Sequence, residues 1–242
     1  IVDPAPFVST NCEGTDTVCR AALKVGLDRV VHVSTDEVYG SIDVGSFVES
    51  DALAPSSPYS ASKAASDLIA LSYHVTHGLP VVVTRSTNNY GRFQFPEKIV
   101  PLFITKLLSG GQVPLYGDGQ NVRDWCHVDD NCTAVDLVLR EGVAGETYNI
   151  GSGNEITNRH LTERLLALCG AEDDRIQMVD DRPGHDRRYS VDTTRIRSLG
   201  WTPSRDMDVG LAETVDWYRE HPEWWEPLLI ENPLHSENRN AT

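Results

Sequence analysis

Residues Arg29–Ser34 read RVVHVS and residues Leu79–Thr84 read LPVVVT, and a helix-like segment, Ser60–Thr76, lies between them. Both short runs are rich in β-branched residues, which is typical of strands buried in a parallel sheet. Gly78 and Pro80 end the intervening helix. Strand, crossover helix and strand form a βαβ unit, so the pattern predicts an α/β fold with a Rossmann-like, doubly wound parallel sheet.

Helices and strands continue on both sides of this unit. Asn11–Val25 carries apolar residues at helical spacing before Gly26 and predicts a helix. Beyond Asn89 the pattern predicts a smaller α+β part with helices over 99–108, 128–140, 158–168 and 210–220, strands over 113–116 and 146–150, and an aromatic segment with Trp217, Trp224 and Trp225. Asp118-Gly119 has the character of a hairpin turn. The expected helix caps are Asp129 or Asp130, and Asn158.

Composition excludes several classes of function. The 242 residues have a net charge of -15, with 40% hydrophobic and 24% charged residues, and no apolar run approaches the roughly 18 residues of a membrane helix. The acidic balance argues against a nucleic-acid partner. The five cysteines and eight histidines show no metal-ligand spacing, so we expect no metal and a reducing, cytoplasmic setting.

Two clusters of polar residues carry candidate chemistry. Ser34–Gly40, STDEVYG, directly follows a predicted buried strand, where open α/β sheets bind ligands. Alone, it would also fit an ordinary polar turn. Its adjacent carboxylates repel each other, so we expect a raised pKa for at least one. Tyr59 and Lys63 lie at i and i+4 of a helix, where an ammonium favours the phenolate and lowers the pKa of the tyrosine. The YxxxK pattern alone is common.

Together with these clusters, further motifs resemble a known family. They are SPYSASKAASD (57–67), NNYG (88–91), FPEK (95–98), PLYGDGQNVRDW (114–125) and DRPGHDRRY (181–189). The sequence is similar to the extended short-chain dehydrogenase/reductases, and among them to the dTDP-glucose 4,6-dehydratases, from about residue 2 to 229. In that superfamily the Asp-Glu pair after the threonine distinguishes dehydratases from epimerases and decarboxylases.

The resemblance implies a two-domain organisation. We expect residues 1–88 to be the remainder of an NAD-binding Rossmann domain, to which 126–151 return. Residues 89–125 and 152–230 would bind the sugar nucleotide, and 231–242 would form a flexible tail. The family's glycine-rich phosphate turn and acidic ribose-binding residue do not occur in the 242 residues, and residue 1 is not Met. We therefore expect further residues upstream, and poor NAD binding by residues 1–242 alone.

The resemblance also implies a reaction, the NAD-dependent conversion of dTDP-glucose to dTDP-4-keto-6-deoxyglucose. Tyr59 would remove the proton of the sugar 4-hydroxyl while hydride leaves C4, with Lys63 assisting and Thr35 bonded to the C4 oxygen. Glu37 would then take the C5 proton, and protonated Asp36 would donate to the departing C6 hydroxyl. Hydride returns to C6, so the enzyme is a hydro-lyase of deoxysugar biosynthesis.

Binding residues follow from the same resemblance. Ser34, Tyr59, Lys63 and Asn89 would contact the cofactor. The sugar nucleotide would be held by Asn89, Glu97, Lys98, Pro114, Tyr116, Arg123, Asn158, Arg182 and His185. Arginines suit a diphosphate because the guanidinium donates two parallel hydrogen bonds. Arg187 and Arg188 fit a solvated basic loop equally well.

Other functions and the assembly state stay open at this point. An epimerase or reductase of the same fold would use Tyr59 and Lys63 and leave Asp36 and Glu37 idle, and an inactive, truncated chain is a further alternative. The family pairs two subunits through a four-helix bundle, which corresponds to the predicted helices at 11–25 and 60–76. We therefore expect a homodimer, with Leu68, Ile69 and Leu71 as candidate contacts.

Overall fold

The computed structural model describes residues 3–182 and 184–230 and divides into two compact units. The first contains residues 3–89, 122–155 and 184–204, and the second contains 90–121, 156–182 and 205–230. These boundaries differ from the expected domains chiefly at 184–204, which pack in the first unit and not with the predicted sugar-nucleotide part. The predicted tail, 231–242, lies outside the described residues.

A parallel sheet forms the centre of the first unit. Its strands are ordered β1 (Val30–Thr35), β2 (Val81–Ser86) and β6 (Thr147–Ile150). Val30 pairs with Val81, and Val83 with Thr147. The helix α3 (Pro58–His77) connects β1 to β2, so the predicted βαβ unit is confirmed. Ser57 and Ser60 cap α3 reciprocally, which begins the helix before Tyr59.

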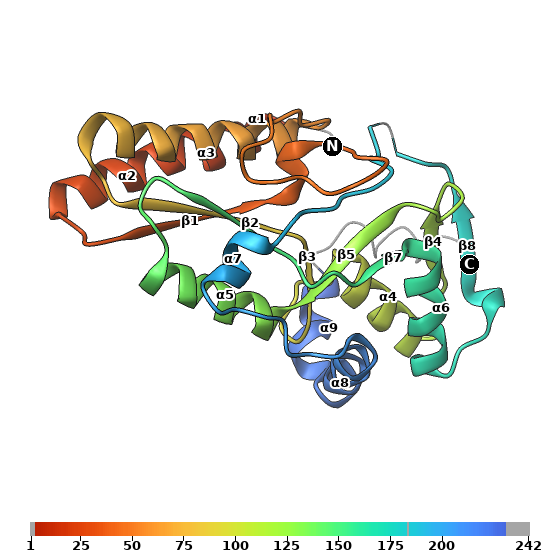
Figure 1. Ribbon diagram of the computed structural model, residues 1–242. Helices are drawn as coiled ribbons and strands as arrows, with labels where there is room; N and C mark the ends of the chain where they lie inside the picture. The colour runs from red at the N-terminus through yellow and green to blue at the C-terminus, as the bar shows by residue number, and fades with distance from the viewer. Residues whose placement is uncertain (1–2, 183, 231–242) are drawn as a thin grey trace. The chain divides into compact units, whose positions relative to one another are not determined.

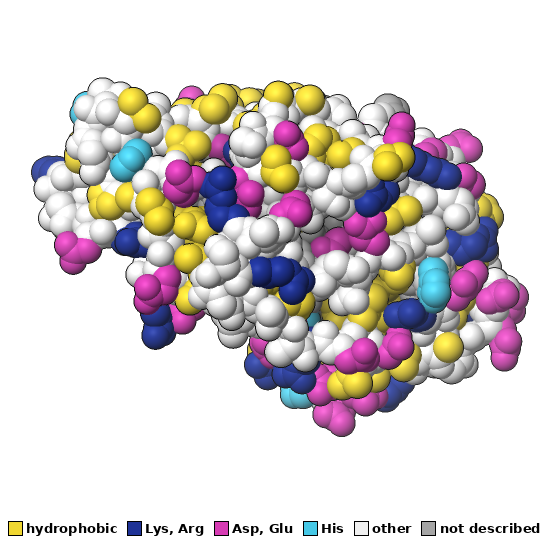
Figure 2. Space-filling view, in the orientation of Figure 1, with side chains coloured by type: hydrophobic (Ala, Val, Ile, Leu, Met, Phe, Trp, Pro, Cys, Tyr) yellow, Lys and Arg dark blue, Asp and Glu magenta, His cyan; other side chains and the backbone are white. Residues whose placement is uncertain are grey.

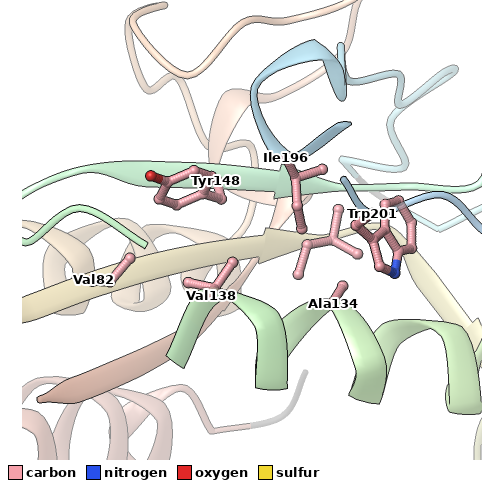
Figure 3. Packing of buried hydrophobic residues seen from close by; sticks show 7 residues of the cluster. Val82, Ala134, Val138, Tyr148, Ile196 and Trp201 are labelled. Carbon is pink, nitrogen blue, oxygen red and sulfur yellow. The ribbon is translucent and has the colours of Figure 1, made fainter. Parts of the chain in front are cut away.

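Helices cover both faces of this sheet (Figure 1). The helix α2 (Gly14–Val25) follows α1 (Ala5–Phe7) and the π-helical η1 (Val8–Glu13), and it packs with α3 on Val81 and Val83. On the opposite face, Val82 packs on α5 (Val128–Glu141) in a cluster that includes Trp201 after α7 (Thr194–Ser198), as Figure 3 shows. This alternation explains why β2 is apolar at successive residues.

A second sheet contains β3 (Asn88–Tyr90), β5 (Val122–His127) and β7 (Glu155–Thr157) in the order β3-β5-β7. The sequence pattern did not predict these short, polar strands. The expected cap of α5 was wrong, because His127 rather than an aspartate accepts the backbone N–H of Asp129.

The second unit joins a two-stranded sheet to four helices. The strands are β4 (Val113–Tyr116) and β8 (Ile176–Val179), which pair in parallel, and the short 3-10 helix η3 (Asp173–Arg175) precedes β8. The helices are α4 (Ile99–Leu108), α6 (Asn158–Cys169), α8 (Met207–Glu220) and α9 (Pro222–Ile230). The predicted hairpin at Asp118-Gly119 is therefore wrong, since β4 pairs with β8 and β5 belongs to another sheet. Thr157, not Asn158, caps α6.

Candidate active site

The polar cluster after β1 folds into a tight turn. Asp36–Tyr39 form the 3-10 helix η2, and Thr35 caps it by accepting the backbone N–H of Glu37 at 3.3 Å. The hydroxyl of Thr35 also lies 3.3 Å from Oδ1 of Asp36. Since β1 lies in a parallel sheet, this turn presents Thr35, Asp36 and Glu37 at the carboxyl end of a strand.

Asp36 is a strongly perturbed carboxyl in this turn. It is 3% exposed, and burial, followed by the negative charges of Glu37 and Asp124, raises its pKa to about 8. Its Oδ2 has no hydrogen-bond partner among the described residues. The expectation of a raised pKa for one of the adjacent carboxyls is confirmed.

Tyr59 and Lys63 lie one turn apart near the start of α3. The ring of Tyr59 packs edge-on against Phe7, with 5.5 Å between centroids. Burial, and then the charges of Glu37 and Asp36, raise the pKa of Tyr59 to about 12. The Nζ of Lys63 donates to the carbonyl oxygen of Val33 at 2.6 Å. The expected lowering of the pKa of Tyr59 is therefore wrong, because burial and the two carboxyls of η2 raise it.

Arg123 of β5 is buried in the same unit. Its guanidinium donates to the carbonyl oxygens of Val122 and Asp186 at 2.7 and 2.8 Å and lies 4.1 Å from the ring centroid of Tyr189. Burial lowers its pKa, whereas the negative charges of Asp36 and Glu37 raise it. Arg123 is thus held as a fixed cation near the two carboxyls of η2.

The other predicted binding residues are distributed over both units. Asn89 and His185 belong to the first unit with Ser34, and the amide of Asn89 donates to the carbonyl of Thr87. The second unit contains Glu97, Lys98, Pro114, Tyr116, Asn158 and Arg182. There the guanidinium of Arg182 lies 5.2 Å from the ring centroid of Tyr116, and Lys98 pairs with Glu97 at 3.3 Å.

Acidic and basic side chains are interspersed on the face shown in Figure 2. The role of each arginine therefore depends on its own contacts. Arg188 donates to both carboxylate oxygens of Glu155 at 2.8 and 3.1 Å, which favours a structural role for it over a solvated loop.

The sequence pattern did not predict a buried hydrogen-bond network that joins β2, α3 and η2. Arg85 of β2 contacts Asp67 of α3 and Tyr39 of η2. An arginine directly after the apolar run VVVT was the available signal, because a charge in a buried strand requires partners. Asp124, which accepts a hydrogen bond from Ser152 at 2.7 Å and raises the pKa of Asp36, was also missed.

Within residues 3–182 and 184–230, no group of three or more His, Cys, Asp or Glu side chains could hold a metal ion. Over the same residues, no helix combines the length and apolar character needed to cross a membrane.

Known proteins share most of this chain. The family model described as GDP-mannose 4,6 dehydratase matches residues 1–214. A dTDP-glucose 4,6-dehydratase of Streptomyces antibioticus is 59% identical over 229 residues, covering 94% of this chain and 68% of that protein. The chain belongs to the dTDP-glucose 4,6-dehydratases of the extended short-chain dehydrogenase/reductase family.

Solved structures of relatives agree with this family. DesIV, a dTDP-glucose 4,6-dehydratase from Streptomyces venezuelae solved with NAD and TYD bound, has a TM-score of 0.93 and 56% identity, covering 94% of this chain and 71% of that one. The UDP-glucose 4-epimerase of Thermus thermophilus, solved with NAD, has a TM-score of 0.81 and 29% identity, covering 88% and 74%. The α/β fold class with a Rossmann-like sheet is confirmed.

Proposed function

We propose that this protein dehydrates dTDP-glucose to dTDP-4-keto-6-deoxyglucose with NAD as its cofactor. The observation that carries the proposal is the turn Thr35-Asp36-Glu37 at the end of β1, in which Asp36 is buried beside Glu37 and has a raised pKa. A buried carboxylic acid beside a second carboxylate provides the general acid and the general base that an elimination requires. An epimerase of this fold has no need for that pair.

The residues present fit the nicotinamide end of a dinucleotide at the carboxyl end of β1. The hydroxyl of Ser34 is buried without a hydrogen-bond partner among the described residues, and Lys63 brings an ammonium to the adjacent carbonyl of Val33. We assign Ser34, Tyr59, Lys63 and Asn89 to holding the nicotinamide end. When bound, NAD supplies the hydride acceptor for oxidation at C4 and the donor for reduction at C6.

In the first half of the reaction, the side chains act on the C4 hydroxyl. Tyr59 receives its proton as the base, and Thr35 orients the oxygen by a hydrogen bond. Because the charges of Glu37 and Asp36 raise the pKa of Tyr59, protonated Asp36 favours the phenolate relative to ionised Asp36. Oxidation and the protonation of Asp36 are thereby coupled.

In the second half, the carboxyls of η2 act on C5 and C6. A ketone at C4 acidifies the C5 proton, which Glu37 accepts, and Asp36 donates its proton to the departing C6 hydroxyl as water forms. Arg123 stabilises the negative charge near both carboxyls. Glu97, Lys98, Pro114, Tyr116, Asn158, Arg182 and His185, together with Asn89, are assigned to the nucleotide sugar.

Incubation of the full chain with NAD and dTDP-glucose, followed by mass spectrometry, tests this function. We expect a product lighter than the substrate by one water, with a ketone at C4. A C4 epimer of unchanged mass would instead establish the epimerase alternative, and no conversion would contradict both. UDP-glucose serves as the parallel substrate for the preference of nucleotide base.

We further propose a homodimer formed through α2 and α3. Leu68 of α3 is 61% exposed, and Ile69 lies in a shallow depression between these helices that is lined also by Cys12, Glu13, Asp16, Thr17 and Arg20. Leu71 packs on the core of its own chain, so it is removed from the candidate contacts. The free thiols of all five cysteines support a cytoplasmic setting, which cell fractionation would test.

A further inference from the structure

A buried ion pair lies behind the turn η2. Arg85 of β2 is 4% exposed, and its Nε donates to Oδ2 of the fully buried Asp67 at 2.9 Å. The other neighbours of Asp67 include His32, whose Nε2 lies 3.2 Å from Oδ1. Burying two charges costs free energy that an apolar pair would avoid, so this pair calls for an explanation beyond stability.

The same guanidinium contacts the turn. Nη1 of Arg85 donates to the hydroxyl of Tyr39 at 2.7 Å, and the guanidinium carbon lies 4.8 Å from the centroid of that ring. The hydroxyl of Tyr39 in turn donates to Oδ1 of Asn149 in β6 at 2.8 Å, and its ring stacks on Phe47. Tyr39 is therefore fixed by its hydroxyl and by its ring face.

The two side-chain partners of Arg85, Tyr39 and Asp67, lie on elements that also carry proposed catalytic residues. Tyr39 is the last residue of η2, which begins at Asp36. Asp67 lies one helical turn after Lys63 and two turns after Tyr59 on α3. Because the guanidinium is planar, Nε and Nη1 keep a fixed geometry, and a single side chain holds both elements to β2.

We infer that Arg85 is a positioning residue that sets the carboxyls of Asp36 and Glu37 relative to Tyr59 and Lys63. The inference rests on the proposed function, in which Tyr59 acts in oxidation and the carboxyls act in elimination. Loss of the contact between Arg85 and Tyr39 removes one of the contacts that fix η2 but leaves α3 paired through Asp67. Elimination should then slow while C4 oxidation is retained.

Tyr39→Phe in the full chain tests this separation. We expect elimination to slow by about tenfold to 100-fold, since small misplacements of reacting groups have effects of this order. With dTDP-glucose deuterated at C5 or at C4, the isotope effect on kcat should rise for C5 and fall for C4. Tyr148→Phe is the matched control, because Tyr148 is also buried and its hydroxyl accepts the backbone N–H of Val143 at 3.0 Å. It should leave the ratio of the two isotope effects unchanged.

Arg85→Lys provides a second variant that keeps the charge beside Asp67. A lysine is a point donor and cannot hold two partners in the geometry of a guanidinium, so it should shift the isotope effects in the same direction. If the wild-type enzyme is active and either variant keeps the wild-type ratio of C5 to C4 isotope effects, the inference about Arg85 is wrong while the proposed function stands. A wild-type chain that forms no 4-keto-6-deoxy product would overturn the proposed function and this inference with it.

Discussion

Lys63 donates its ammonium hydrogen bond to the carbonyl oxygen of Val33, at 2.6 Å, and so ties α3 to β1. Burial lowers the pKa of Lys63, while Asp67 one turn later raises it. Tyr59, on the same face of α3, has a pKa of about 12 and is protonated at neutral pH. Burial disfavours the phenolate most, and the charge of Glu37 and any charge on Asp36 add to this effect, so the protonation state of η2 modulates the proposed base.

Removal of the tyrosine hydroxyl should stop the reaction at its first step. Tyr59→Phe takes away the proposed base for the C4 hydroxyl, and general-base catalysis is worth roughly 10²–10⁴-fold in rate. We expect kcat to fall by that order, with the 4-keto product forming correspondingly more slowly, measured by product mass. Tyr148→Phe serves as the control, and we expect its kcat to equal that of wild type. Wild-type turnover by Tyr59→Phe would contradict the assignment.

Glu37→Gln should separate oxidation from elimination. The amide of this variant cannot accept the C5 proton, so C4 oxidation should persist while loss of water stops. The measurement is the absorbance of reduced nicotinamide after mixing with dTDP-glucose, together with product mass. We expect reduced nicotinamide to accumulate without the 4-keto-6-deoxy product. Unchanged product formation would remove Glu37 from the mechanism.

The raised pKa of Asp36 makes both activity and stability dependent on pH. Its folded-state pKa of about 8 exceeds the ordinary value of 3.8, so the folded state binds more protons between these values. The free energy of unfolding should therefore fall as pH rises from about 4 through about 8. Elimination should decline above pH 8 as Asp36 loses its proton.

Urea unfolding of wild type and Asp36→Asn over this pH range measures the contribution to stability. The amide of the variant cannot titrate, so its free energy of unfolding should fall less steeply with pH than that of wild type. Parallel slopes for the two proteins would show that Asp36 is already ionised in the folded state at neutral pH.

The proposed dimer depends on apolar side chains of α2 and α3. Leu68→Glu places a charge on the exposed face of α3 without touching the core, so it should shift a dimer toward monomer. Size-exclusion chromatography with light scattering at micromolar concentration measures this. The control is Val209→Glu on α8, which is also exposed but lies in the other unit. A wild-type monomer would contradict the dimer.

The sequence predicted the elements with strong periodicity. The helix over Ile99–Leu108 and the strand over Val113–Tyr116 have the predicted bounds, and β1 and β2 differ from theirs by one or two residues. The short strands β3, β5 and β7 were missed because residues such as Asn88, Asn89 and Arg123 carry no apolar alternation. Their structure depends on partners distant in sequence, which local patterns do not record.

The site was predictable in composition but not in electrostatics. STDEVYG and YSASK identified the groups, whereas the contact of Lys63 with Val33 and the effect of Asp124 on Asp36 arise only when α3 and β5 pack near the end of β1. The link from Arg85 to Tyr39 joins residues 46 apart in sequence. Such a contact is specified by the sheet register, so spacing along the chain could not predict it.

Substitution of Ile150 tests how much the buried core beside β6 contributes to the stability of the first unit. Ile150 is fully buried on β6, in the cluster of Val82, Val138 and Trp201 that Figure 3 shows, and it follows Asn149, the acceptor for Tyr39. Ile150→Ala leaves a cavity in this core and should destabilise the first unit by about 2–5 kcal/mol. Leu139→Ala on α5 is the control, because that side chain is 45% exposed, and it should cost less than half as much. Thermal melting followed by circular dichroism compares the two. Equal losses would mean that the cluster contributes no more than an exposed helix residue.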